Sequence, residues 1–261
     1  MDRKILIPIL LGLAAASPSH SSSIVYARVQ AAGTVAHTIT IDLADPDVRV
    51  SVALAQGGAG RSESFKSMIK RGRPAAAITG TFFDTRTLIP TGDIALFGHV
   101  VHSGCIGSAL CIDSNNKASI VPLRAGRQCR WTGYETVLCA GPTLTSEGKV
   151  AIALKHEGFR RSLMASARRT AVGITKSGKL LLVAVNRPAS LYSVAKLMIK
   201  MNVTHALSLD GGSSTAFFCK GSYRAMPGRT LTNCLVVYST FQDYLKAKTA
   251  LAPAKLLASA R

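Results

Sequence analysis

Acidic residues are the scarcest chemical type in this 261-residue chain. Thirteen Asp and Glu residues stand against 32 Lys and Arg residues, which gives a formal net charge of +19 at pH 7. This excess predicts attraction to phosphates, acidic polysaccharides or anionic membrane faces. Nucleic acid would also suit the charge, but the chain has one Trp, 6% aromatic residues and no nucleic-acid-binding motif. We therefore expect an anionic partner that is not nucleic acid.

Long apolar runs are absent as well. The sequence has no run of about 18 or more apolar residues, which excludes a conventional membrane-spanning helix. No segment repeats with a period of roughly 20 to 50 residues, which argues against solenoids and propellers. Hydrophobic residues make up 48% and charged residues 17% of the chain, so we expect a buried core in one large or two small domains.

Several familiar catalytic motifs are missing. The chain contains no G-x-S-x-G, no Walker loop, no G-x-G-x-x-G and no H-E-x-x-H, which leaves the chemistry of those motifs without support. The six histidines are scattered, as structural histidines are. We predict no cofactor. Asp84 and Asp210 could ligate a divalent metal ion, although no ligand spacing demands one.

The N-terminal segment predicts export. Residues 1–16 combine a basic start, an apolar run at 5–13 and three alanines at 14–16, which is the pattern of a signal peptide. The alternative is a buried N-terminal strand or helix. We expect residues 17–30 to form a flexible leader and the mature chain to be periplasmic or extracellular.

Six cysteines agree with an oxidising compartment. None has C-x-x-C spacing or a nearby histidine, so disulfides are favoured over metal ligation. Six cysteines allow 15 pairings. Proximity in the sequence suggests one set of disulfide pairs. If the protein is not exported, the alternative is that the cysteines are buried thiols. The suggested pairs are Cys105–Cys111, Cys129–Cys139 and Cys219–Cys234.

Hydrophobic periodicity predicts an α+β fold, with a mixed, largely antiparallel curved sheet and a few packed helices. Alternating apolar residues predict antiparallel hairpins from the strand pairs 35–43 with 48–54 and 170–175 with 180–185. Ser62 and Ser190 are expected to begin helices. Further strands are expected at 75–78, 205–209, 216–219 and 234–238. One domain would span 31–240, followed by a basic tail at 241–261.

The strongest candidate for chemistry is the segment 210–215, Asp-Gly-Gly-Ser-Ser-Thr, which follows an apolar strand. Gly211 and Gly212 allow a tight turn whose N–H groups could bind an anion. A carboxylate at a rigid strand end suits a base, a nucleophile or a hydroxyl-binding group, and that carboxylate is Asp210. Three hydroxyls suited to phosphate or sugar oxygens follow, namely Ser213, Ser214 and Thr215. The alternative is an ordinary hairpin turn.

Two further segments carry candidate residues. Arg168 and Arg169 precede a strand, and arginine binds phosphate through paired hydrogen bonds, although a solvated charge pair is the alternative. The segment 79–84 places Gly80 between hydroxyls, ahead of two aromatic residues and Asp84. Glycoside chemistry commonly uses two carboxylates. The candidates outside turns and surface contexts are Asp84, Asp93, Asp113, Glu135, Glu157 and Asp210.

These segments together resemble the phosphodiester glycosidase family. The motifs occur in order as ITGTFFD (78–84), CAGPTL (139–144), ARRTAVGIT (167–175), ALSLDGGSSTAFF (206–218) and RTLTNCLVVY (229–238). The resemblance implies an exported hydrolase that cleaves the bond between a sugar's anomeric carbon and a phosphodiester oxygen in an envelope or exopolysaccharide-type substrate. The implied partner is an anionic glycan or a sugar phosphodiester.

The resemblance also implies roles for individual residues. The implied catalytic residues are Asp210, Arg169 and Asp84. The implied substrate- or phosphate-binding residues are Thr79, Gly80, Thr170, Gly211, Gly212, Ser213, Ser214 and Thr215. Three positions depart from the family's usual pattern: Thr79 replaces Asn, Ser213 replaces Gly, and Asn186 with Arg187 replaces Asp-Gly. Thr79 and Asn186 favour the alternative function, a non-catalytic binder of anionic cell-wall polysaccharide.

Overall fold

The computed structural model describes residues 22–104, 106–126 and 129–251. The expected signal peptide at 1–16, residues 17–21 of the expected leader, Cys105 with its expected bridge, and residues 252–261 lie outside these ranges. The described part contains three antiparallel sheets and three α-helices. The predicted α+β class is therefore confirmed, with three sheets in place of one.

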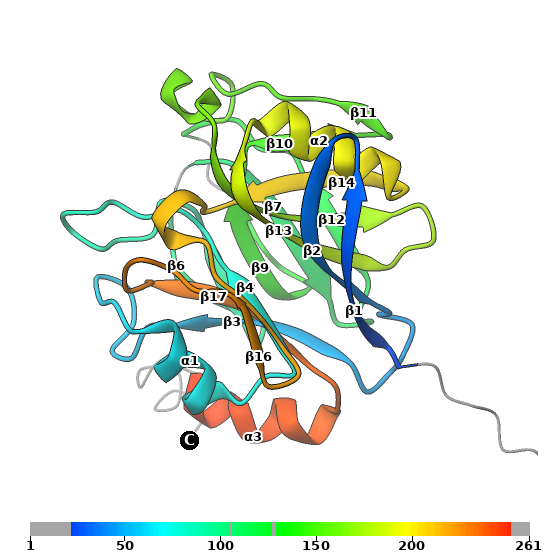
Figure 1. The fold of residues 1–261 in the computed structure, drawn as a ribbon. Helices are drawn as coiled ribbons and strands as arrows, with labels where there is room; N and C mark the ends of the chain where they lie inside the picture. Colours follow the sequence, from blue (N-terminus) through cyan, green and yellow to red (C-terminus); the bar gives the residue numbers. More distant parts are fainter. Residues whose placement is uncertain (1–21, 105, 127–128, 252–261) are drawn as a thin grey trace, which may run out of the picture.

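A seven-stranded sheet forms one side of the molecule (Figure 1). Its strand order is β1-β2-β13-β12-β14-β10-β11. The bounds are β1 Ile24–Ala31, β2 Thr34–Ile41, β10 Thr143–Ser146, β11 Lys149–Val150, β12 Ala167–Thr175, β13 Leu180–Ala189 and β14 Val203–Leu209. The predicted hairpin of β12 and β13 is confirmed, with Thr170 opposite Ala184.

Two five-stranded sheets complete the fold. One has the order β16-β15-β4-β17-β3 and the other β6-β5-β9-β7-β8. The first comprises β3 Arg49–Leu54, β4 Ala76–Thr79, β15 Phe217–Cys219, β16 Ser222–Ala225 and β17 Asn233–Tyr238. The second comprises β5 Ile94–Leu96, β6 His99–His102, β7 Ser108–Asp113, β8 Ala118–Val121 and β9 Tyr134–Ala140.

Helices α1 and α2 begin at serine caps, which satisfy backbone N–H groups that have no partner inside a helix. Helix α1 spans Phe65–Gly72 and is capped by Ser64, two residues after the expected Ser62. Helix α2 spans Leu191–Lys200 and is capped by Ser190, as predicted. Helix α3 spans Phe241–Leu251. Short 3₁₀ helices occur at η1 Arg161–Met164 and η2 Gly212–Ser214.

The core divides along the two faces of the seven-stranded sheet. Successive side chains of a strand point to opposite faces, so Leu180 and Leu182 of β13 join the large core shared with both smaller sheets. Leu181 and Val183 point the other way, into a second cluster with α2. The sheet is therefore buried on both faces, which accounts for the near-continuous apolar run at 180–185.

Two expectations about the chain's organisation are wrong. Segment 34–41 does not pair with 49–54, because β2 pairs with β1 and β13 while β3 pairs with β17 in another sheet. The part of the expected leader that is described is mostly β1, hydrogen-bonded along all eight residues to β2. The basic segment 241–261 begins as helix α3, and Tyr244, Ala247 and Leu251 pack this helix against the large core.

The expected disulfides are not formed between described residues, because all five described cysteines are free thiols. Cys219 pairs with Ala76 on one side of β4, whereas Cys234 pairs with Thr79 on the other side. Two strand spacings amount to roughly 9–10 Å, beyond the separation that a disulfide can bridge. The Cys219–Cys234 pairing is therefore wrong. Cys129 and Cys139 share a cluster but remain thiols.

We predict that Trp131→Phe destabilises the fold by about 1.5–3 kcal/mol. The indole Nε1–H of Trp131 donates to the buried carboxylate of Asp93 at 2.6 Å, and Phe keeps one aromatic ring but removes this donor and part of the indole's volume. The free energy of unfolding, from urea denaturation, measures the loss. Tyr134→Phe is the control, since Tyr134 packs edge-on against Trp131. Equal stabilities of both variants would contradict the role of this hydrogen bond.

Candidate active site

The candidate site lies at the end of β14, where backbone hydrogen bonds join the sheets. The N–H of Asp210, the first residue after β14, donates to the carbonyl of Gly80 at 3.0 Å, and Gly80 N–H donates to the carbonyl of Asn233 at 3.2 Å. Gly141, two residues before β10, donates its backbone N–H to the carbonyl of Ser208 in β14 at 2.8 Å. These bonds hold the ends of β4, β14 and β17 together.

The segment 210–215 forms a tight turn at this junction. Gly212 has φ +56, a conformation that favours glycine. Gly211 is required by a close approach, since a Cβ there would lie 2.6 Å from the carbonyl oxygen of Arg168. Ser214 N–H closes the turn onto Gly211 at 3.0 Å. Thr170 donates its hydroxyl to the carbonyl of Asp210, so this predicted binding residue supports the turn from β12.

The carboxyl group of Asp210 has an unusual environment. Burial raises the pKa of Asp210 to about 6, against the lowering effects of hydrogen bonds from the Ser214 side chain and the Gly211 backbone and of the charge on Arg229. Desolvation disfavours the charged form of an acid. The group therefore titrates near neutral pH, which is the range suited to general acid–base work.

The segment 79–84 lies against this turn through Gly80. A Cβ at Gly80 would meet the Asn233 amide oxygen at 1.9 Å, so any larger residue would push the Asn233 side chain out of place. That oxygen accepts the Thr81 N–H at 2.7 Å, and the Asn233 Nδ2 group donates to the Thr81 carbonyl at 3.4 Å. Asn233 thus acts as a side-chain substitute for a strand partner. Sequence reasoning missed it as a site residue, although it stands in the RTLTNC motif.

Three hydroxyls around this junction are buried without a hydrogen-bond partner among the described residues. They belong to Thr79, Thr81 and Thr215. A buried hydroxyl without a partner is unfavourable, so these groups mark places where water or a ligand hydroxyl would be stabilised. Thr79 and Thr215 were predicted as binding residues, whereas Thr81 was not.

Arg169 does not face the turn. Its guanidinium is buried, with the side chain 4% exposed, and donates to the carbonyls of Ala189 at 3.0 Å, Leu163 at 2.8 Å and Ala165. Burial also lowers the pKa of Arg169. The side chain joins η1 to the end of β13.

The arginines that meet the turn are Arg168 and Arg229. Arg168 donates to the carbonyl of Thr215 at 3.4 Å and to that of Met226 at 3.2 Å. Arg229 stacks over the Phe83 ring at 4.7 Å and lowers the pKa of Asp210 through its charge. The sequence analysis named both Arg168 and Arg169 but gave the catalytic role to Arg169. It missed Arg229, which is the first residue of the RTLTNC motif.

Asp84 lies on an exposed loop. Its Oδ1 accepts the backbone N–H groups of Arg86 and Thr87 at 2.9 Å each. Hydrogen bonds from Thr87 first, and then from Arg86, hold the pKa of Asp84 below its usual range. The carboxylate therefore shapes the 84–89 loop.

The remaining candidate carboxylates serve other parts of the fold. Asp93 binds Trp131, and Asp113 accepts N–H groups of its own turn. Glu157 is buried and accepts Ser108 Oγ–H at 2.9 Å and Thr143 N–H at 3.0 Å. Burial raises the pKa of Glu157. Glu157 thereby holds the start of β10, which pairs with β14, the strand that leads into Asp210. Glu135 lies elsewhere, at the start of β9.

No group of three or more His, Cys, Asp or Glu residues in the described ranges is arranged to hold a metal ion. Within the same ranges, no helix is long and apolar enough to cross a membrane.

The comparisons with known proteins agree with this architecture. A model of the phosphodiester glycosidase family matches residues 72–238. The chain therefore belongs to the phosphodiester glycosidase family, as its motifs predicted. Among curated proteins, the N-acetylglucosamine-1-phosphodiester alpha-N-acetylglucosaminidase of Bos taurus is 34% identical over 74 residues, which are 26% of this chain and 14% of that protein. The chain thus matches a small part of that relative's length.

Solved structures show the same fold at low identity. The catalytic domain of zebrafish N-acetylglucosamine-1-phosphodiester alpha-N-acetylglucosaminidase, auto-inhibited by its pro-peptide, has a TM-score of 0.68 at 23% identity and 86% coverage of both chains. A hypothetical protein from Synechocystis has a TM-score of 0.64 at 17% identity, and the match covers 86% of this chain and 64% of that one. A Burkholderia pseudomallei protein described as exported has a TM-score of 0.56 at 14% identity, and the match covers 78% of this chain and 74% of that one.

We predict that Arg169→Met destabilises the protein by about 2–4 kcal/mol, because buried carbonyls would lose charged donors. Urea denaturation measures the effect. Arg168→Met is the matched control, since its hydrogen bonds are longer and more exposed, and it should cost less than about 1 kcal/mol. If Arg169→Met were stable and Arg168→Met were destabilised, the structural role would belong to Arg168 and not to Arg169.

Proposed function

We propose that this chain hydrolyses a glycosyl phosphodiester, breaking the bond between the sugar's anomeric carbon and a phosphate oxygen. The observation that carries the proposal is the place of Asp210 in the tight turn after β14, where burial raises the pKa of its carboxyl to about 6 and the charge on Arg229 acts to lower it. Membership of the phosphodiester glycosidase family supports the same reaction class. The names of the bovine and zebrafish relatives describe an activity on a sugar phosphodiester, which agrees with it.

The reaction consumes one water molecule. The C–O bond to phosphate breaks, the phosphate monoester leaves with the bonding electron pair, and water supplies the new hydroxyl of the sugar and one proton. Arg229 and Arg168 would hold the phosphate oxygens, because guanidinium groups bind phosphate with strong, paired hydrogen bonds. Stabilising the departing charge accounts for most of the expected rate gain.

Asp210 would act as a carboxylate near the anomeric carbon. In that form it either stabilises an oxocarbenium-like transition state or accepts the proton of the attacking water. Ser214 and Gly211 hold the carboxyl in place through hydrogen bonds. Thr79, Thr81 and Thr215 have buried hydroxyls, so in this proposal they support the turn from behind and do not bind the sugar directly.

In this proposal the other predicted residues act through the scaffold. Gly80, Gly211 and Gly212 allow the close backbone contacts, and Thr170 supports the turn. Ser213 is exposed and lies at the open side of the turn. Arg169 and Asp84 become positioning residues, since their polar atoms are engaged by the chain itself.

The substrate class follows from charge. A chain with a net charge of +19 is attracted to polyanions, and a glycan that contains phosphodiesters, such as an envelope polymer or exopolysaccharide, is one. Action outside the cytoplasm is supported by the signal-peptide pattern at 1–16 and by the exported description of the Burkholderia relative.

We predict that Asp210→Asn lowers kcat on a sugar-1-phosphodiester at least about 100-fold while substrate binding is retained. Asn matches the size of Asp and can still accept the Ser214 hydrogen bond, but it carries no negative charge. Released sugar measures kcat, and calorimetry with a non-hydrolysable analogue measures binding. Asp47→Asn, in the exposed turn before β3, is the control.

Full activity in Asp210→Asn would remove this residue from the mechanism. If the wild-type chain binds anionic glycans but releases no sugar from any phosphodiester in a panel, the non-catalytic binder replaces the hydrolase.

We predict that kcat/KM of the wild-type protein rises with pH through about 6 and then levels off, because the ionised form of Asp210 is the active one. Arg229 favours that ionised form, so Arg229→Gln should move the rise to higher pH as well as lower the rate. Arg224→Gln is the control, since Arg224 stacks on Tyr26. A rise that stays in place or moves to lower pH in Arg229→Gln would contradict this coupling.

A further inference from the structure

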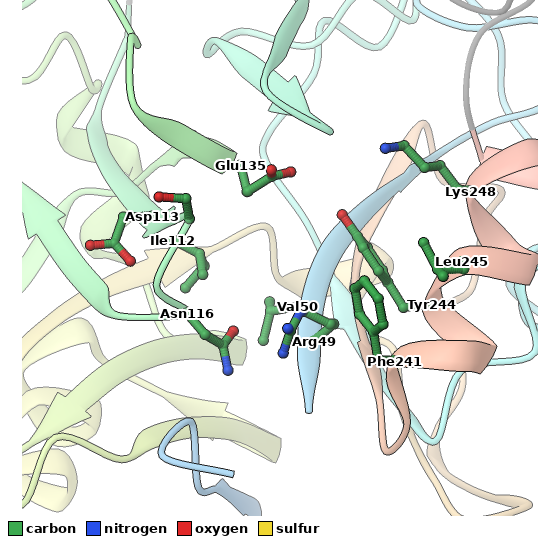
Figure 2. Close-up of a pocket in the computed structure, with 11 residues that line it drawn as sticks. Arg49, Val50, Ile112, Asp113, Asn116, Glu135, Phe241, Tyr244, Leu245 and Lys248 are labelled. Carbon is green, nitrogen blue, oxygen red and sulfur yellow. The ribbon is translucent and has the colours of Figure 1, made fainter. Parts of the chain in front are cut away.

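A cavity lies away from the candidate active site and shares no residue with it. Its volume is about 250 Å³, and it is formed where the start of β3, the β7–β8 turn, the start of β9 and helix α3 meet (Figure 2). The lining residues are Arg49, Val50, Ile112, Asp113, Ser114, Asn116, Glu135, Phe241, Tyr244, Leu245 and Lys248.

Four charged side chains line this cavity without forming ion pairs. Arg49 and Lys248 carry positive charge, and Asp113 and Glu135 carry negative charge. The ion pairs within the described ranges are Arg71–Glu63, Lys179–Asp42 and Lys246–Asp243, none of which involves these four groups. Two acids at one cavity stand out in a chain that has only 13. The formal charges sum to zero, so the cavity suits an uncharged but strongly polar ligand.

The two cations are held in place by aromatic rings and carbonyls. The Arg49 guanidinium lies 4.8 Å from the centre of the Phe241 ring and donates to the carbonyls of Pro46 and Val48. The Lys248 ammonium lies 5.0 Å from the centre of the Phe97 ring. Preorganised donors lose little freedom when they bind a ligand, and a guanidinium has five N–H groups.

Asn116 contributes an acceptor that has no partner. Its side chain is 7% exposed, and its Nδ2 donates to the carbonyls of Leu43 and Val48 at 3.0 Å each. These two bonds fix the amide orientation, because a flipped amide would set its oxygen against two carbonyl oxygens. The Oδ1 atom then has no hydrogen-bond partner among the described residues. In Figure 2 this oxygen is turned toward the side of Val50.

Helix α3 supplies an apolar wall. Phe241 and Leu245 lie one turn apart on α3 and are 38% and 40% exposed. Residues four apart share a face of a helix, and Figure 2 shows both beside Tyr244 on the α3 side of the cavity, across from Asp113 and Asn116. The cavity therefore combines an apolar surface with donors and acceptors on the other sides.

We propose that this cavity binds one sugar unit of an uncharged glycan. A sugar hydroxyl both donates and accepts, so one ring can donate to Glu135 and accept from Arg49, while its C–H face lies on Leu245. The buried amide of Asn116 ties the β7–β8 turn to the residue before β3 and so fixes the wall behind the ring. The volume is below the range of about 300–1,000 Å³ typical of drug-sized ligands, which fits a single unit. This binding needs no bond cleavage and does not rest on the proposed hydrolase activity.

Isothermal titration of the full chain with maltotriose, cellotriose and chitotriose, and with the zwitterion glycylglycine, tests the proposal. At least one trisaccharide should bind, and glycylglycine should not. Glu135→Gln and Leu245→Ala should each weaken that binding at least tenfold, and both changes are at exposed side chains that leave the core intact. The matched controls Glu147→Gln and Val150→Ala, exposed on another sheet edge, should change it less than twofold.

Three results would overturn the proposal. The first is no binding of any trisaccharide, and the second is binding of glycylglycine alone, which would point to a zwitterionic ligand. The third is binding that survives both cavity variants but is lost in Asp210→Asn, which would place the sugar in the candidate active site. Thermal denaturation of each variant excludes misfolding as the cause.

Discussion

The candidate site depends on the close approach of two backbones at Gly80. The Gly80 carbonyl accepts the N–H of Asp210, and the position of its missing Cβ lies 1.9 Å from the Asn233 amide oxygen. A Cβ there would displace the Asn233 side chain from its hydrogen bonds with Thr81, so glycine at this position preserves the contact at which β4, β14 and β17 end. This contact brings the carboxyl of Asp210, the turn after it and the segment leading from Arg229 to one point.

The electrostatics of the site follow from this packing. Burial disfavours the ionised Asp210, and the opposing influences are local: the Ser214 hydroxyl, the Gly211 N–H and the charge on Arg229. In a chain with a net charge of +19, most cations are too far away or too well solvated to act on it, since exposed charges are screened within about 10 Å at ordinary salt. The near-neutral pKa of Asp210 thus reflects burial first, which the two hydrogen bonds and the charge on Arg229 only partly offset, and not the overall charge of the chain.

Local sequence patterns predicted many of the helices and strands but not which strands pair with one another. Helix α2 and the β12–β13 hairpin were predictable because their apolar spacing, caps and turn are contiguous in the sequence. The alternation at 35–43 and 48–54 predicted two strands correctly but paired them wrongly, because an alternating pattern records which face is buried and not which strand lies beside it. The cysteine pairing failed for the same reason, since β4 separates Cys219 from Cys234.

The candidate site was predictable to a similar degree. The motif at 210–215 identified Asp210 and its glycines, because a turn motif is local. The assignment of Arg169 over Arg168 was not decidable, since neighbouring residues of a strand point to opposite faces and β12 has a register shift between Ala167 and Arg169. Arg229 meets Asp210 through contacts between distant segments, so no local signal marked it.

The departures from the family's pattern differ in their consequences. Ser213 is exposed, and its backbone lies outside the positive-φ positions, so the turn does not require glycine there. Asn186 is also exposed and donates to the carbonyl of Arg224 at 3.0 Å, which ties β13 to β16. Thr79 is different, because it is 1% exposed and its hydroxyl lacks a partner among the described residues. The threonine thus leaves one buried hydroxyl without a hydrogen bond near the Asp210 turn. Of the three departures, Thr79 is therefore the one that alters the buried polar groups behind the candidate site.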